Sequence, residues 1–304
     1  MAQPSHLRGI GAMLLAAGVF VGNDTCMKLA MEDAPPFQVL AMRGLAACIW
    51  CLPLVLFTGQ GRALPLAASP WVVLRSLFEL SAILMFILAL NQMAIADVTA
   101  ILQISPFLVL LGGWMIWGER ISGGRLLLIA IGIIGALMVA QPGSSTASPF
   151  AILGFAAAVG AAARDIASRK VGANVPALVV TFAVLVIVMV AAFFCMLLFE
   201  TAVMPTRRAL ALMALAGFLL MCGHAFVFLA FRLAPARAVA PFNYSSTLWA
   251  VVSGIVAFGH FPDGLALIGM ALIILTGLGV ILLEGRIRQG ALPSLDPDAS
   301  VISK

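Results

Sequence analysis

Acidic and basic side chains at helical spacing inside apolar segments are the residues of this sequence best suited to chemistry. In GVFVGNDTCMKLAM, residues 18–31, Asn23 and Asp24 are followed by Lys28. Asp24 and Lys28 are four residues apart and therefore share a helix face. A charge inside a lipid bilayer costs on the order of 2.5–3.5 kcal/mol, so it normally faces a partner or water. We expect either a structural ion pair near a helix end or groups that line a route for a polar substrate.

Two further pairs have the same spacing. Arg75 and Glu79 lie in RSLFEL, and Asp165 and Arg169 lie in RDIASR. A carboxylate without a basic partner could hold a cationic substrate group, and Glu79 is the candidate for that role; Asp24 or Glu79 could also bind a proton. The alternative is that each pair only neutralises itself, and that Arg75 extends toward the membrane surface.

Uncharged polar and aromatic side chains supply a second set of candidates. Gln103 and Tyr244, the only tyrosine, occur in otherwise apolar segments, and Trp249 follows five residues after Tyr244. Gln103 and Tyr244 could hydrogen-bond a substrate, and an aromatic ring could stack on a flat one. The alternative is hydrogen bonding between helices, worth about 0.6 kcal/mol per bond.

Two isolated basic side chains, those of Arg43 and His224, each allow two interpretations. Arg43 is expected near the outer end of the second apolar segment, where it could reach the surface or pair with Asp24. His224 could titrate during transport, or it could be a packed, hydrogen-bonded side chain.

The composition places all these residues in a membrane protein. The 304-residue chain is 63% hydrophobic and 10% charged, with a mean hydropathy of +1.15, whereas soluble domains carry about 25% charged residues. The net charge of +5 is ascribed to loops at the membrane surface and not to nucleic-acid binding.

Nucleotide-binding, hydrolase and metalloprotease motifs are absent from the sequence, which argues against a primary pump or an enzyme. We expect no catalytic residue, metal site or cofactor.

Apolar segments long enough to cross a bilayer organise the chain. Since a crossing needs about 20 residues, we predict ten helices, near residues 9–30, 36–57, 71–93, 97–117, 123–141, 149–170, 175–198, 209–232, 237–258 and 264–284. Lysines and arginines gather at one side if both termini are cytoplasmic. Only Arg207 and Arg208 oppose this orientation.

The chain also repeats itself. A shift that places Pro35 on Pro176 also places Asp24 on Asp165. An odd number of five helices per repeat makes the second repeat enter the membrane from the opposite side, as in many secondary transporters. We therefore predict an all-α membrane protein of two inverted repeats. The predicted domains are 1–145, 146–288 and a disordered cytoplasmic tail, 289–304.

Two segments carry a family resemblance. AIADVTAILQISPFLVLLGGWMIWGERIS (94–122) and APARAVAPFNYSSTLWAVVSGIVAFGHFPD (234–263) resemble the signature segments of EamA-type transporters of the drug/metabolite transporter superfamily. The resemblance implies a carrier of a small organic metabolite in the bacterial inner membrane, as a monomer or homodimer, that works by alternating access. The second segment ends in Gly259-His260 where the family often has Gly-Glu, while Glu119 keeps the first glutamate.

Finer similarities suggest what is carried. NDxxxK and APFNY look like the branch of S-adenosylmethionine uptake carriers, and ADVTAILQ and ARDIASRKV look like a branch with riboflavin importers. We expect an importer of a cofactor-like compound such as riboflavin. The alternatives are import of S-adenosylmethionine and export of amino acids or drugs on the same fold.

Overall fold

The structure is a computed structural model that describes residues 4–118, 121–141 and 148–290. All its regular elements in these ranges are helical. In chain order they are α1 (Pro4–Ala30), α2 (Pro36–Phe57), η1 (Gln60–Ala68), α3 (Pro70–Gln92), α4 (Ile95–Leu102), α5 (Ser105–Trp117), α6 (Gly123–Ala140), α7 (Ala151–Ser168), α8 (Ala177–Phe199), α9 (Arg207–Leu233), α10 (Ala236–Val239), η2 (Ala240–Tyr244), α11 (Ser245–Phe258) and α12 (Gly264–Gly290). Glu119 and residues 291–304 of the predicted tail lie outside the described residues.

Nine helices in the described ranges are long and apolar enough to span a membrane. α4 and α5 together form one of the nine, Ile95–Trp117. Many large apolar side chains lie exposed, among them Phe57, Leu198 and Val256. Such a surface is suited to lipid, so the prediction of a multi-pass, all-α membrane protein is confirmed.

The segment predicted as a single helix at 237–258 is divided into α10, η2 and α11. Pro241 lies in η2, and a proline has no backbone N–H to continue the α-helical hydrogen bonds. A comparable break separates α4 from α5, just before Pro106 in the first turn of α5. Each break places a polar residue in the middle of an apolar segment, Gln103 at the first break and Asn243 at the second.

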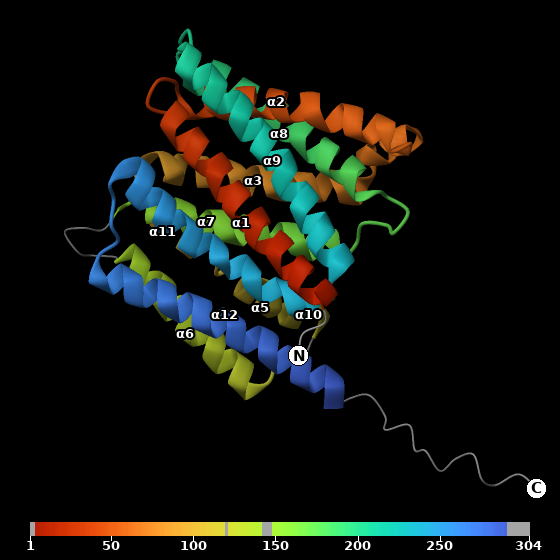
Figure 1. Ribbon diagram of the computed structural model, residues 1–304, viewed down its shortest axis with the longest axis vertical. Coiled ribbons are helices and arrows are strands. Elements are labelled where there is room, and N and C mark those ends of the chain that lie inside the picture. The colour runs from red at the N-terminus through yellow and green to blue at the C-terminus, as the bar shows by residue number, and fades with distance from the viewer. Residues whose placement is uncertain (1–3, 119–120, 142–147, 291–304) are drawn as a thin grey trace, which may run out of the picture.

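The helices pack as a stack of layers (Figure 1). α2 and α8 contact each other at one side of the stack, and α6 and α12 contact each other at the opposite side. Between them, α1 packs against α9 and α3 packs against α7. α4 meets α11, and α5 meets α7. The interior of the molecule is therefore formed by α1, α3, α7 and α9 together with the interrupted helices.

Glycines allow the closest of these contacts. A Cβ atom added at Gly135 of α6 would lie 2.8 Å from the carbonyl oxygen of Gly269 in α12. Small residues of this kind replace hydrophobic burial as the means of close helix packing in membranes.

Polar contacts join the loops at the end of the bundle where α2 begins. Glu200 accepts hydrogen bonds from the backbone N–H groups of Phe37 (2.9 Å) and Gln38 (3.1 Å), and so caps α2. Arg208 pairs with Glu32 at 3.0 Å. The carboxylate of Glu32 thus neutralises one of the two arginines that oppose the predicted orientation.

Candidate functional site

A cavity of about 430 Å³ lies between helices from both halves of the chain. Its wall includes residues of α1, α2, α3, α7, α8 and α9, and residues at the two helix breaks. Its charged and polar side chains are Asn23, Asp24, Arg43, Arg75, Glu79, Gln103, Ser105, Arg164, Asp165, Thr181, His224 and Asn243. Three of these are arginines and three are acidic residues, so basic and acidic groups are equal in number on the wall.

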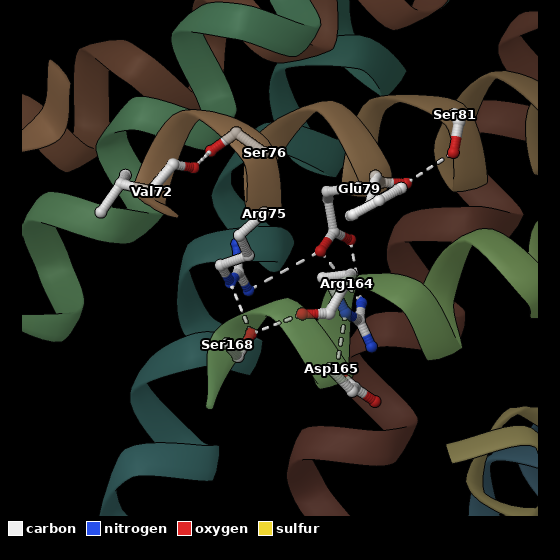
Figure 2. Close-up of polar contacts among 9 residues, drawn as sticks. Val72, Arg75, Ser76, Glu79, Ser81, Arg164, Asp165 and Ser168 are labelled. Carbon is white, nitrogen blue, oxygen red and sulfur yellow. Dashed lines mark hydrogen bonds and ion pairs between the residues drawn. The ribbon is translucent and has the colours of Figure 1, made fainter. Parts of the chain in front are cut away.

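Four of these charges form one network across α3 and α7, which we call the α3–α7 ion cluster (Figure 2): Arg75, Glu79, Arg164 and Asp165. Arg164 Nη1 donates to both carboxylate oxygens of Glu79 at 3.0 Å. Arg164 Nε donates to Asp165 Oδ1 at 2.8 Å. Arg75 Nη2 lies 3.7 Å from Glu79 Oε2, which confirms the predicted Arg75–Glu79 pair.

A serine completes this cluster. Arg75 Nε donates to Ser168 Oγ at 3.1 Å, and Ser168 Oγ donates to the carbonyl of Arg164 at 2.7 Å. Figure 2 shows Arg75 and Glu79 extending from one helix toward Arg164 and Ser168 on the other. Glu79 therefore lies between two guanidinium groups and is not the carboxylate without a basic partner that the sequence suggested. The partner that compensates it, Arg164, comes from the opposite half of the chain.

A second group of charges, on α1 and α2, is connected more loosely. Asn23 Nδ2 donates to Asp24 Oδ1 at 2.8 Å. Arg43 Nη1 donates to Asn23 Oδ1 at 3.5 Å, at the long limit for a hydrogen bond. Only 5% of Arg43 is exposed, and its Nε has no hydrogen-bond partner. The amide of Asn23 thus lies between an acid and a base.

His224 of α9 also lines the cavity, and its ring meets the ring of Phe20 edge-on at a centroid distance of 5.3 Å. Gln103 lines it at the first helix break and donates to the carbonyl of Asn243 at the second break, at 3.3 Å. The two breaks therefore meet at the cavity wall.

The predicted Asp24–Lys28 pair is wrong. Lys28 Nζ donates to the carbonyls of Leu90 and Met93, each at 2.6 Å, and lies 5.6 Å from the centre of the Phe258 ring. The last carbonyls of a helix lack partners within the helix, and the ammonium of Lys28 satisfies two of them at the end of α3. Lys28 is not among the residues that line the cavity.

The predicted Asp165–Arg169 pair is also wrong. Asp165 bonds to its neighbour Arg164, while the guanidinium of Arg169 lies 4.8 Å from the centre of the Trp117 ring. Arg169 follows the last residue of α7 and is not part of the cavity wall. Asp165, which precedes Arg169 by just over one helical turn, does lie on the wall.

Tyr244 and Trp249 do not line the cavity either. Tyr244 is 5% exposed and its ring covers Gly277 of α12. The ring of Trp249 lies over Gly18 of α1 and is partly exposed. Each aromatic ring packs against a glycine of a neighbouring helix. Of the nine predicted site residues, the cavity wall holds Asn23, Asp24, Glu79, Gln103 and Asp165.

Arg164 is the residue that sequence reasoning missed. It immediately precedes Asp165 in an otherwise apolar helix. An arginine in such a segment requires a partner or water just as an acid does. That signal was available in RDIASR, but the i,i+4 spacing drew attention to Arg169 instead.

Comparison with known proteins gives one family. Residues 7–141 match the EamA-like transporter family. A pseudopaline exporter of Pseudomonas aeruginosa is 26% identical over 268 residues, covering 88% of this chain and 93% of the relative. An S-adenosylmethionine uptake transporter of Rickettsia prowazekii is 26% identical over 93% of this chain and 95% of its own. A riboflavin transporter of Rhizobium johnstonii is 28% identical over 66% of each chain.

A solved crystal structure has the same fold. It superimposes with a TM-score of 0.59 at 22% sequence identity, covering 94% of this chain and all of that chain. The relatives with assigned names are transporters, and their names describe both uptake and export.

Proposed function

We propose that this chain is a member of the EamA-like transporter family, whose model matches residues 7–141, and that it carries a small charged organic metabolite through the cavity by alternating access. The observation that carries this proposal is the set of three arginines and three carboxylates around one cavity. Charges are costly inside a membrane protein and are found where a substrate or ion passes. A solute that brings charges of both signs would match this wall.

We also propose that the carrier consists of two inverted repeats, residues 1–145 and 146–288. The helix contacts support this division. If α7 corresponds to α1 and α9 to α3, the contact of α1 with α9 has its counterpart in the contact of α7 with α3. Likewise α2 meets its own counterpart α8, and α6 meets α12. Each half also holds one interrupted helix, and such helices surround the sites of many secondary transporters.

For the orientation, we propose that both termini face the cytoplasm of a bacterium and that the protein lies in the inner membrane. The start of α1 and the end of α12 lie at the same end of the bundle (Figure 1). Of the two arginines that oppose this orientation, Arg208 faces the acidic side chains Glu32 and Asp33 at 3.0 and 3.8 Å. Both arginines still count against this orientation, because acidic residues contribute little to the positive-inside rule, but the lysines and arginines at the opposite side outnumber them.

Of S-adenosylmethionine and riboflavin, two compounds named for relatives, S-adenosylmethionine matches the charges of the cavity wall better. It carries a carboxylate, an ammonium and a sulfonium, so it offers an acceptor for an arginine and cations for Asp24 or Asp165. Asp165 is suited to a cation because its side chain is 44% exposed and its ion pair uses only Oδ1. Glu79 is less suited because two arginines already compensate it.

Riboflavin is the second candidate, supported by the similarity to a riboflavin transporter over 202 residues. A neutral flavin would have to stack on Phe20 or Phe86, the aromatic residues of the cavity wall, since Tyr244 and Trp249 lie elsewhere. A flavin would also leave the charges of the wall without a role in binding. We therefore place it second.

Transport by membrane vesicles tests these proposals. Inside-out and right-side-out vesicles from cells with and without the protein are loaded with labelled S-adenosylmethionine, riboflavin, amino acids or nucleosides. We expect saturable flux of S-adenosylmethionine or of another solute with charges of both signs, and the vesicle orientation that shows it gives the direction. A proton ionophore in parallel samples shows whether a proton gradient drives that flux.

Variants of two arginines, one in the cavity wall and one outside it, test whether transport depends on the cavity. Arg164→Gln should lower the flux at least tenfold, whereas Arg207→Gln, at the exposed start of α9, should leave it unchanged. Flux of riboflavin alone, unaffected by Arg164→Gln, would refute the proposal of a charged substrate.

A further inference from the structure

We propose that Asn23, Asp24 and Arg43 form a subsite for an α-amino-acid group, in which Arg43 binds the carboxylate and Asp24 binds the ammonium. This inference rests on the proposed function and names the part of the substrate that the α1–α2 side of the cavity recognises. All three residues line the cavity, and α1 and α2 contact each other.

Arg43 differs from the other two arginines of the cavity wall. Arg164 lies 3.0 Å from a carboxylate oxygen and Arg75 lies 3.7 Å from one. Arg43 has no ion pair within the part of the chain that the structure describes, although it is 5% exposed and therefore the most deeply buried of the three. A buried charge without a close opposite charge is costly. An anionic group of a ligand would supply the missing partner.

The hydrogen bonds of Arg43 are also incomplete. Among the described residues its side chain makes one hydrogen bond, to Asn23 Oδ1 at 3.5 Å, and its Nε has no partner there. A guanidinium has five N–H donors in a planar fork that matches a carboxylate with two parallel bonds. A carboxylate in the cavity could therefore bind Arg43 without breaking a strong contact. The α3–α7 ion cluster, by contrast, already has its carboxylates in place.

Asp24 supplies the second half of the subsite. Its Oδ1 accepts one hydrogen bond from Asn23, and no ion pair of Asp24 is present among the described residues. Asn23 keeps Asp24 and Arg43 apart, because its amide nitrogen faces the acid and its amide oxygen faces the base. An α-amino-acid group presents an ammonium and a carboxylate on the same carbon atom. Binding it would add no net charge to this buried region.

Paired ligands test this assignment on the purified full-length protein. The first pair is S-adenosylmethionine and its decarboxylated form, which lacks only the carboxylate. The second pair is methionine and 3-methylthiopropylamine, which differ in the same way. For each pair, the ratio of the two dissociation constants, from calorimetry or competition binding, measures recognition of the carboxylate. Because a charge-assisted hydrogen bond is among the stronger polar contacts, we expect the carboxylate form to bind about 10- to 100-fold more tightly.

Variants then test which residue recognises the carboxylate and which recognises the ammonium. Arg43→Gln should bring the ratio close to one, mainly through weaker binding of the carboxylate form, and Arg43→Lys should restore part of it. Arg207→Gln, outside the cavity, should keep the wild-type ratio. Asp24→Asn should weaken methionine relative to its deaminated analogue, 4-methylthiobutanoate.

Two results would overturn the subsite. One is a wild-type ratio near one, which needs no variant and is independent of any folding defect. The other is a wild-type ratio that persists in folded Arg43→Gln protein. The proposed function fails separately, if vesicles show no flux of any charged solute. Flux of zwitterions together with a ratio near one would refute the subsite and leave the transport proposal intact.

Discussion

Arg164 on α7 donates from Nη1 to both carboxylate oxygens of Glu79 on α3, each at 3.0 Å. The two residues are 85 positions apart in the sequence and belong to the two proposed repeats. Their side chains are 26% and 14% exposed, so the pair lies at the boundary between protein and cavity. The contact ties the two halves together directly at the cavity wall. A rocking movement of the halves would have to break or rearrange it.

A double-mutant cycle measures this link. Removing either partner leaves the other charge poorly compensated, so Glu79→Gln and Arg164→Gln should each destabilise the protein by about 1–3 kcal/mol. The double variant should be less destabilised than the sum of the two, with a coupling of about 0.5–3 kcal/mol, because both charges then disappear together. Thermal unfolding in detergent measures both the destabilisation by each substitution and the coupling free energy between them. Additive effects of the two substitutions would mean that the contact contributes nothing.

Lys28 offers a test that separates a structural charge from a charge of the substrate site. Its ammonium binds the carbonyls of Leu90 and Met93 at the end of α3. Lys28→Met should therefore lower stability by about 1–3 kcal/mol, since it leaves these carbonyls without a partner. The KM for transport should change less than twofold in the folded variant. A large rise in KM with unchanged stability would return Lys28 to the substrate site.

Tyr244 should act through packing alone. Its ring covers Gly277, where an added Cβ would overlap it, and it lies outside the cavity wall. Tyr244→Phe keeps the ring and should leave flux unchanged. Gly277→Ala forces the ring aside and should cost about 1–3 kcal/mol, as overpacking does. Flux assays and thermal unfolding of both variants check this, and loss of flavin transport in Tyr244→Phe would contradict it.

Asp263 should give stability a dependence on acid pH. It precedes α12, where its Oδ1 accepts from Ala266 N–H at 2.7 Å, and its Oδ2 accepts from Gln141 Nε2 at 2.6 Å. These hydrogen bonds lower the pKa of the Asp263 carboxyl below its usual value of 3.8. The stabilisation is therefore fully present above pH 3.8 and is lost as the pH falls through the lower pKa of the folded protein.

The comparison with Asp263→Asn isolates this effect. Above pH 5 the wild type should melt at a higher temperature than the variant, and the difference should shrink as the pH falls below 3.8. A difference that is constant over this range would show that the carboxylate charge has no part in it.

Much of the fold follows from the chain alone, because a bilayer demands apolar segments of a set length. Prolines and glycines between those segments gave helix boundaries close to those observed, as at Pro36 and Phe57 for α2. Neither the break between α4 and α5 nor the break at η2 was predicted, because residues 97–117 and 237–258 were each expected to form one helix. The apolar character of residues 237–258 continues through Pro241, and hydropathy does not register the missing backbone donor.

The site was less accessible to sequence reasoning because its charges pair between helices. Spacing identifies which residues share a helix face, but not whether a better partner lies on another helix. Lys28 reaches the end of α3, and Glu79 binds Arg164 of α7. Tyr244 stands out in the sequence as the only tyrosine, but its placement depends on the space beside Gly277, which follows from helix packing and not from the local sequence.

Counterflow into proteoliposomes tests most directly whether the substrate passes through the charged cavity. Two variants of α9 make the same substitution, leucine to tryptophan, at different places. Leu220→Trp enlarges a side chain that lines the cavity, whereas Leu215→Trp changes a residue outside the cavity wall that is 45% exposed. We predict saturable counterflow of S-adenosylmethionine in the wild type and in Leu215→Trp, and at least a tenfold lower rate in Leu220→Trp that still unfolds cooperatively. Wild-type rates in Leu220→Trp would contradict the account.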